Sequence, residues 1–306
     1  MVRLLLAWLG VMLSVGHAGE RADLVAGKVQ VSSVVRLVEG GRYRQAVRQS
    51  RRILERSGSS PAVVSLMGIA LARSGLHSDA LPWLEQGKGT RMYSEHGGAS
   101  AHADALRAVG FGDRAWRVRS GAIEAEWSAG RRVRALSHGI DDLLSSGRVQ
   151  AALEAGEAAV LQAPNSATAH AFYSTALLAS GSIAEAEFHH WLSQRLSNRR
   201  IPRIAINEAR LAAQYDDEVG ALRAWGRASI QRRNDPQIAA WHAEWLRSRG
   251  EFSTAWSVLD RPVMGRQQHA ALIIERIRVL EGLGRANEAE KERIRAQRLF
   301  PTVAED

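Results

Sequence analysis

The chain has 306 residues, of which 45% are hydrophobic and 24% charged, a composition too hydrophobic for a disordered protein and too polar for one with several membrane spans. It carries 41 Lys and Arg against 32 Asp and Glu, a formal net charge of +9. The absence of cysteine excludes a disulfide scaffold, a Cys-ligated metal site and a thiol nucleophile. This length allows two domains or one elongated array.

The first 18 residues have the pattern of an export signal. Arg3 supplies one positive charge, residues 4–15 form an apolar run, and Gly16-His17-Ala18 is a small-x-small cleavage site. The apolar run is shorter than the roughly 20 residues that a membrane-spanning helix needs. We therefore expect cleavage of the signal peptide (residues 1–18) after Ala18 and a periplasmic protein. The alternatives are a retained signal anchor and a buried first helix.

A pair of small residues recurs along the chain at steps of about 34 residues. The glycine of each pair suits a tight turn between two helices, and the alanine five positions later lets two helices approach closely. The pairs are Gly41/Ala46, Gly75/Ala80, Gly110/Ala115, Gly147/Ala152, Gly181/Ala186, Gly250/Ala255 and Gly284/Ala289. The step of 69 residues from Gly181 to Gly250 predicts one degenerate unit, in which Gln214 and Val219 take the two positions.

Prolines mark the end of the second helix in two units, because Pro164 and Pro301 each lie seventeen residues after a repeat glycine. This pattern resembles the tetratricopeptide repeat, a helix pair of about 34 residues. The resemblance implies an all-α fold, a right-handed α-solenoid of antiparallel helix pairs over residues 28–306, preceded by a lead-in segment at 19–27. Eight units are expected to start near residues 27, 61, 96, 133, 167, 200, 236 and 270, with extra residues at 129–132.

The common catalytic motifs are missing from the sequence. It has no His-Glu-x-x-His, no Gly-x-Ser-x-Gly, no Gly-Lys-Ser/Thr phosphate loop and no dinucleotide-binding Gly-x-Gly-x-x-Gly. The best histidine cluster is His189 and His190 with Glu185, whereas a zinc site needs three or four convergent ligands. We therefore expect packing or surface histidines, no enzyme activity, and no cofactor or metal. A metal-dependent hydrolase that uses His189 is the catalytic alternative.

Arginines gather in three stretches of the chain. We expect most of them on a solvated outer face, where arginines near helix C-termini are favoured by the helix dipole. The alternative is contact with an acidic protein, an acidic glycan or an anionic membrane surface. Nucleic acid is not an expected partner, because the chain is expected to be exported. The stretches contain Arg42, Arg44, Arg48, Arg51, Arg52 and Arg56; Arg114, Arg117, Arg119, Arg131, Arg132 and Arg134; and Arg195, Arg199, Arg200 and Arg203.

The resemblance also implies a partner-binding groove, because first helices of tetratricopeptide repeats line a concave surface that holds peptides or partner helices. The matching positions here are Asp104, Arg107, His138, Asp141, Phe172, Thr175, Glu208, Trp241, Glu244, Arg247, Glu275 and Arg278. The C-terminal half is the favoured contact surface, since Trp and Arg dominate many interfaces. The alternative for Trp241 and Trp245 is packing between units. The Lys/Asn/Arg clamp that some members use for a C-terminal carboxylate is not reproduced.

The function implied by the resemblance is a non-catalytic scaffold or adaptor for protein–protein interactions in the bacterial cell envelope. Secretion, pilus, outer-membrane and exopolysaccharide assemblies are all open, with one or more envelope proteins as partners. The alternative is a carbohydrate- or cell-wall-binding module that uses groove aromatics and the arginine clusters. Glycan binding through arginines would weaken sharply with ionic strength, whereas apolar anchoring of a protein would weaken little.

Overall fold

The computed structural model describes residues 30–58, 60–125, 128–261 and 268–300, and every regular element within these ranges is helical. The expected export signal at 1–18 and the lead-in segment at 19–27 lie outside the described residues. Among the helices that are described, none is both long enough and apolar enough to cross a membrane.

The chain divides into two compact units. Unit 1 is Met1–Ser74 with Pro82–Gly98, and unit 2 is Gly75–Leu81 with Ala99–Asp306. The division passes through helix α4 (His77–Gly87) at Pro82, a proline inside the helix that cannot donate a backbone hydrogen bond.

Unit 1 contains a helix at 30–39, α2 (Tyr43–Ser57), α3 (Pro61–Arg73), the second part of α4, and α5 (Arg91–Glu95). Helix α3 packs against α2 and α5. At Gly68 of α3, an added Cβ would lie 2.9 Å from the backbone nitrogen of Leu84 in α4, so glycine permits the close approach. The short helix α5 was not predicted; Thr90 caps it, with Oγ1 accepting a hydrogen bond from the Tyr93 N–H at 3.1 Å.

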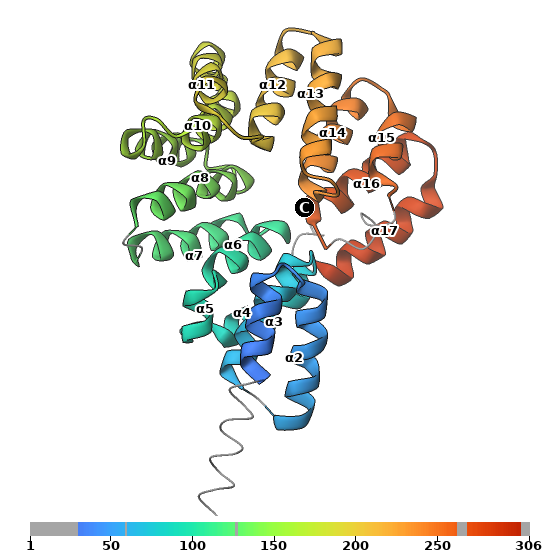
Figure 1. The fold of residues 1–306 in the computed structure, drawn as a ribbon. Helices are drawn as coiled ribbons and strands as arrows, with labels where there is room; N and C mark the ends of the chain where they lie inside the picture. Colours follow the sequence, from blue (N-terminus) through green and yellow to red (C-terminus); the bar gives the residue numbers. More distant parts are fainter. Residues whose placement is uncertain (1–29, 59, 126–127, 262–267, 301–306) are drawn as a thin grey trace, which may run out of the picture. The chain divides into compact units, whose positions relative to one another are not determined.

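Unit 2 is a run of antiparallel helix pairs (Figure 1). The pairs are α6 (Gly98–Ala108) with α7 (Gly112–Ala125), α8 (Ala129–Ser145) with α9 (Val149–Gln162), α10 (Ala167–Ser180) with α11 (Ile183–Leu196), α12 (Pro202–Gln214) with α13 (Glu218–Gln231), α14 (Pro236–Ser248) with α15 (Phe252–Leu259), and α16 (Ala270–Gly282) with α17 (Ala286–Leu299). First helices of successive pairs also contact each other, as α8 with α10, α10 with α12, and α14 with α16. The predicted all-α solenoid is confirmed.

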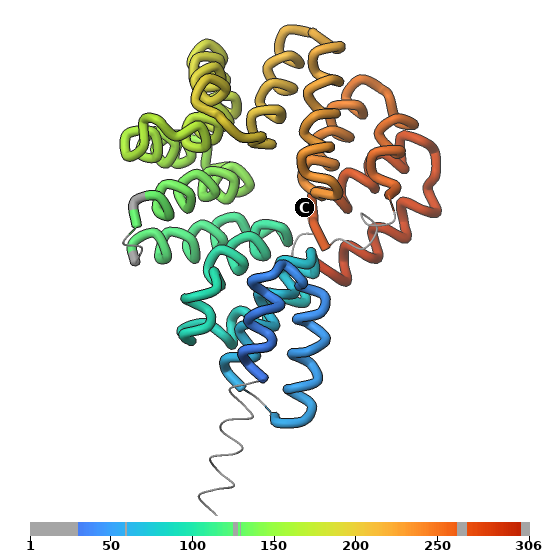
Figure 2. The backbone as a smooth tube through the Cα atoms, viewed as in Figure 1, coloured from blue at the N-terminus to red at the C-terminus, as the bar shows by residue number. Residues whose placement is uncertain are grey.

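The repeated glycines and alanines have the predicted roles. All seven glycines have left-handed backbone, with φ between 67° and 95°. All seven alanines are fully buried. Gly181, for example, follows α10 with φ 82°, and Ala186 lies buried in the next helix, where its carbonyl accepts a hydrogen bond from Ser174 Oγ at 2.8 Å. Each glycine therefore turns the chain, and the tube in Figure 2 shows the reversal after each helix.

The prediction for the degenerate unit is wrong by two residues. Asp216, with φ 55°, takes the glycine position, and the fully buried Ala221 takes the alanine position five residues later. Val219 is instead 57% exposed. Asp is one of the few residues besides glycine that tolerates left-handed backbone, and the motif therefore escaped a pattern defined by glycine.

The extra residues expected at 129–132 lengthen a helix. Helix α8 begins at Ala129 and is 17 residues long, the longest in unit 2 for which bounds are given. The irregular spacing between the third and fourth units is thus absorbed by an added turn of α8 within the described part of the chain.

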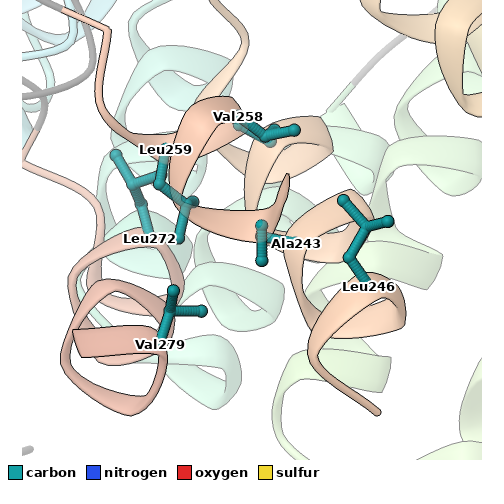
Figure 3. Close-up of a cluster of buried hydrophobic side chains, with 8 residues drawn as sticks. Ala243, Leu246, Val258, Leu259, Leu272 and Val279 are labelled. Carbon is teal, nitrogen blue, oxygen red and sulfur yellow. The ribbon is translucent and has the colours of Figure 1, made fainter. Parts of the chain in front are cut away.

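Apolar clusters join the successive pairs of unit 2. Figure 3 shows one between α14, α15 and α16, in which Leu259 and Leu272 are fully buried. Burial of one such leucine contributes about 1.5–3 kcal/mol. A second cluster joins Val109, which follows α6, to Ile273 of α16 and to Phe300. The beginning of unit 2 therefore contacts its last helix pair.

Candidate functional site

The first helices of the pairs in unit 2 carry all twelve predicted groove residues. We call these helices, α6, α8, α10, α12, α14 and α16, the first-helix row. The row holds charged and aromatic side chains that contact one another between helices in three groups, the first of which also includes Arg119 of the second helix α7.

The first group, the Asp142 cluster, consists of Asp104, Arg107, Arg119 and Asp142. Arg119 Nε donates to Asp142 Oδ2 at 2.5 Å and Nη2 donates to Asp104 Oδ1 at 2.8 Å. Arg107 lies 3.3 Å from Asp142 Oδ1. Burial alone would lower the pKa of Arg119, but the two carboxylates more than offset it, so the pKa is raised. A buried arginine, Arg119, and a half-buried one, Arg107, thus balance two carboxylates.

The second group, the Trp241 cluster, consists of Asp141, Phe172, Arg203, Arg210 and Trp241. Arg203 Nη2 donates to the Asp141 carboxylate, and its guanidinium carbon lies 4.5 Å from the Phe172 ring centroid and 5.3 Å from that of Trp241. Arg210 covers the same indole at 4.6 Å. Burial and the positive charge of Arg203 lower the pKa of Arg210 to about 10. The cluster joins α8, α10, α12 and α14.

The third group joins α14 to α16. Arg247 Nε donates to Glu275 Oε1 at 2.5 Å, a hydrogen bond that raises the pKa of Arg247. Glu275 is buried, and Arg278, half-exposed, lies 3.7 Å from its second oxygen. Glu244 is exposed beside them, whereas Glu208 of α12 pairs with Arg227 at 2.5 Å.

Three predicted groove residues are buried and contact side chains of neighbouring helices. Phe172 lies under Arg203 and against His138, with ring centroids 5.2 Å apart. Burial lowers the pKa of His138 to about 4 and keeps it neutral at pH 7. Thr175 donates to Asn207 Oδ1 at 2.9 Å, and so fixes α10 to α12. Glu275 is the third. The other nine residues keep at least part of their surface accessible.

Trp241 and Trp245 are both half-buried and pack against the core cluster of α12 to α14. Each tryptophan therefore packs between units, as one interpretation of the sequence predicted, and also keeps part of its surface exposed. Arg203 and Arg210 lie over the ring of Trp241, at 5.3 and 4.6 Å from its centroid. The ring of Trp245 lies near His242, with ring centroids 6.4 Å apart.

The expectation of a solvated outer face is wrong for two arginines. Arg119 and Arg203 are buried, with 3% and 8% of their surfaces exposed. Their carboxylate partners are 23 and 62 residues away in sequence, at Asp142 and Asp141. A run of arginines along one stretch gives no sign of such distant partners. The repeat register did not select four residues of the first two groups, namely Arg119, Asp142, Arg203 and Arg210.

His189 does not assemble a metal site with Glu185. Its ring stacks on that of His170 at 5.0 Å, and the two Nδ1 atoms share a hydrogen bond of 2.8 Å. Burial, followed by the charge of His170, lowers the pKa of His189. In the part of the chain that the structure describes, no three His, Cys, Asp or Glu side chains converge to hold a metal ion.

Two exposed aromatics on α11 were not singled out from the sequence. Phe188 and Trp191 are 56% and 51% exposed, and their rings stack at 6.4 Å. Arg195 lies over Trp191 at 5.6 Å. This pair lies on a second helix and so belongs to a different surface from the first-helix row.

Unit 1 has a hollow of about 380 Å³, lined by Val38, Glu39, Tyr43, Ile69, Arg73, Glu95 and His96. His96 and Glu39 approach to 3.6 Å across it. Its charges are mixed and its one aromatic ring besides histidine is Tyr43. The first-helix row of unit 2, where cations and tryptophans gather, is therefore the stronger candidate site.

No family model matches the chain, and no curated protein matches it. Solved structures do. A monomeric IFIT1 mutant with m7Gppp-AAAA is 15% identical, over 89% of this chain and 71% of that one, with a TM-score of 0.51. The APC/C hetero-tetramer Cut9–Hcn1 is 15% identical, over 90% and 54%, with a TM-score of 0.50. A tetratricopeptide repeat protein from Parabacteroides merdae is 12% identical, over 84% and 93%, with a TM-score of 0.47.

At such low sequence identity, a similar structure indicates a similar fold and nothing about function. The likenesses to IFIT1 and to Cut9–Hcn1, together with the helix pairs, the left-handed turns and the buried alanines of the 34-residue repeat, lead to one conclusion. The chain has the fold of the tetratricopeptide repeat proteins.

Proposed function

We propose that this protein is a non-catalytic scaffold of the bacterial cell envelope that binds a partner protein along the first-helix row of unit 2. The observation that carries the proposal is Trp241, a half-buried indole with arginines on its ring and an exposed carboxylate, Glu244, on the same helix. Tryptophan and arginine at a partly desolvated position are the residue types that contribute most to protein interfaces.

Export supports the envelope as the site of action. The apolar run and the Ala18 cleavage site are typical of a signal peptide. Cell fractionation with release of the periplasm tests this: the proposal expects the chain in the periplasmic fraction, beginning at Gly19 by N-terminal sequencing. An intact N-terminus in the membrane fraction would favour a retained anchor instead.

Among structures of similar fold, Cut9–Hcn1 is an assembly of two proteins, and the IFIT1 structure contains m7Gppp-AAAA. A protein partner suits an exported chain better than RNA. We therefore expect no dependence of partner binding on nuclease treatment.

Affinity capture from a cross-linked envelope extract tests the scaffold. The bait is compared with two double variants: Trp241→Ala with Arg278→Ala on the first-helix row, and Phe188→Ala with Trp191→Ala on α11. Arg278 is chosen over Arg247, because Arg247 is the main ion-pair partner of buried Glu275. Without Arg247, that carboxylate would keep only the half-exposed Arg278, and the fold itself would be destabilised. The proposal expects one protein that is lost with the first variant, is kept by the second, and binds the purified chain directly.

Loss with the α11 variant alone would move the interface to the second helices. That surface supports the alternative function, because an exposed tryptophan with an arginine on its face is suited to stacking on a sugar ring. Under this alternative, no protein is captured, and an acidic polysaccharide is retained on the immobilised chain in a manner that Trp191→Ala abolishes and salt weakens.

A further inference from the structure

One arginine of the Trp241 cluster has no carboxylate partner in the described chain. On α6, α12, α14 and α16, the other arginines that are buried or half-buried each lie within 4.0 Å of a carboxylate; they are Arg107, Arg203, Arg247 and Arg276. Arg210 forms no such ion pair with the described residues. Its guanidinium group faces the ring of Trp241 instead, at 4.6 Å.

Arg203 is also only partly satisfied. Its side chain is 9% exposed, and one terminal nitrogen, Nη2, donates to Asp141. The other, Nη1, is buried and has no hydrogen-bond partner among the described residues. A buried donor without an acceptor destabilises the fold, and more so when it is charged. The cluster therefore has two guanidinium groups with unused donors.

The two helices that carry these groups pack loosely against each other. Helices α12 and α14 contact each other less extensively than α10 and α12 or α14 and α16 do. Arg203 and Arg210 of α12 extend to Trp241 of α14, so cation–π contacts span this junction. Two cations over one indole repel each other, and an anion beside both would remove that repulsion.

We propose that a carboxylate on an aspartate or glutamate side chain of the partner protein binds between Arg203 and Arg210, against Trp241. This inference rests on the proposed scaffold function and specifies what the partner presents. A carboxylate is favoured over phosphate, because Asp141 already lies in the cluster and Glu244 lies nearby, and both repel a dianion more than a single charge. Planar guanidinium groups also bind carboxylates through paired hydrogen bonds.

The test uses ¹⁹F NMR of the full chain labelled with 5-fluorotryptophan, in which Trp241→Phe identifies one signal among those of nine tryptophans. The probes are acetyl-Gly-Glu-Gly-amide and its glutamine counterpart. We expect the glutamate peptide to shift the Trp241 signal and the glutamine peptide to require at least about tenfold higher concentration for the same shift.

Arg210→Gln is expected to abolish the difference between the two peptides. Arg223→Gln, which removes an exposed arginine of α13 outside the first-helix row, is the control and is expected to keep it. Equal shifts by both peptides would overturn the proposal in favour of simple stacking on Trp241. So would equal shifts by phosphate, or shifts by glucuronate alone, which would indicate a general anion site or a glycan site.

The two proposals fail separately. If capture yields a direct partner that Arg210→Gln binds as tightly as the natural chain does, the scaffold stands and the carboxylate site is wrong. If the glutamate peptide binds as expected but no protein is captured, the site stands and the scaffold function is wrong.

Discussion

Arginines of the Asp142 cluster and of the Trp241 cluster, both in unit 2, have different kinds of partners. In the Asp142 cluster, Arg119 and Arg107 share two carboxylates, and each guanidinium group has a charged partner within 3.3 Å. In the Trp241 cluster, Arg203 forms an ion pair with Asp141, whereas Arg210 lies over the ring of Trp241 and forms none with the described residues. Each arginine of the first cluster thus forms an ion pair, although Arg107 Nε is buried without a hydrogen bond, whereas Arg210 of the second cluster forms no ion pair with the described residues.

The difference follows the packing of the helices. Where α7 and α8 lie in close contact, side chains between them are desolvated, and an unpaired charge there would be costly. At the looser junction of α12 and α14, Arg210 keeps part of its surface in water, which lowers that cost. Completeness of the ion pairs thus separates arginines that hold the solenoid together from arginines that remain available to a partner.

The same substitution in both clusters gives the largest contrast. Arg119→Gln leaves Asp142, which is fully buried, with Arg107 alone, and we expect a loss of about 3 kcal/mol in the free energy of unfolding. Arg210→Gln leaves no carboxylate unpaired and is expected to change it by less than about 1 kcal/mol. Urea unfolding followed by circular dichroism at pH 7 measures both. Equal losses would remove the distinction between the clusters.

Acid pH is expected to weaken the contact between α13 and α14 through His242. Its ring stacks on Trp225 at 5.6 Å, and neither ring nitrogen has a hydrogen-bond partner among the described residues. Burial, with a smaller contribution from the charge of Arg261, lowers the pKa of His242 to about 4. The unfolded chain, with a pKa near 6.5, then binds the proton first, so stability is full above about pH 6.5 and falls towards pH 4.

His242→Phe keeps the stacked ring and removes this titration. At pH 7.5 we expect little difference from the natural chain, and at pH 4.5 an advantage of about 2 kcal/mol for the variant. Urea unfolding midpoints at the two pH values measure it. Parallel pH profiles for the two proteins would show that His242 is not protonated on unfolding in this range.

The junction of α10 and α12 provides a smaller contrast, because its polar groups are paired. Thr175→Val keeps the shape of the side chain but leaves the Oδ1 atom of buried Asn207 without its donor. We expect a loss of about 1–2 kcal/mol. Thr254→Val on the exposed surface of α15 is the control, and its unfolding midpoint should stay unchanged. A null effect at Thr175 would mean that water replaces the hydroxyl.

The spacing of glycines and alanines in the sequence was sufficient to predict the helix pairs, since each unit repeats the same turn and the same close helix contact. It located the first-helix row as well, and all twelve predicted site residues lie there. The burial of Arg119 and Arg203 could not be predicted, because it depends on carboxylates from other helix pairs. A repeat register describes one pair at a time and contains no information on ion pairs between α8 and α12.

The repeat register also failed where one residue type replaces another in the same backbone conformation. Asp216 has the left-handed backbone of a repeat glycine, and Ala221 follows it at the same spacing of five residues. What that unit repeats is the structural requirement: a residue with left-handed backbone, followed five residues later by a small buried residue. A search that accepted Asp and Asn at the turn would have found it.

The smallest predicted effect tests this turn, which positions α12 and hence Arg203 and Arg210. Asp216→Gly removes the cost of left-handed backbone and is expected to stabilise the chain by up to about 1 kcal/mol, partly offset by the entropy of glycine in the unfolded state. Gln214→Gly, at the end of α12, is expected to destabilise it by about 0.5–1 kcal/mol. Thermal unfolding of the two variants measures both signs. If Gln214→Gly stabilised the chain and Asp216→Gly destabilised it, the turn would lie at Gln214, as the sequence pattern predicted. The arginines of α12 would then lie on a different face of the row from Trp241.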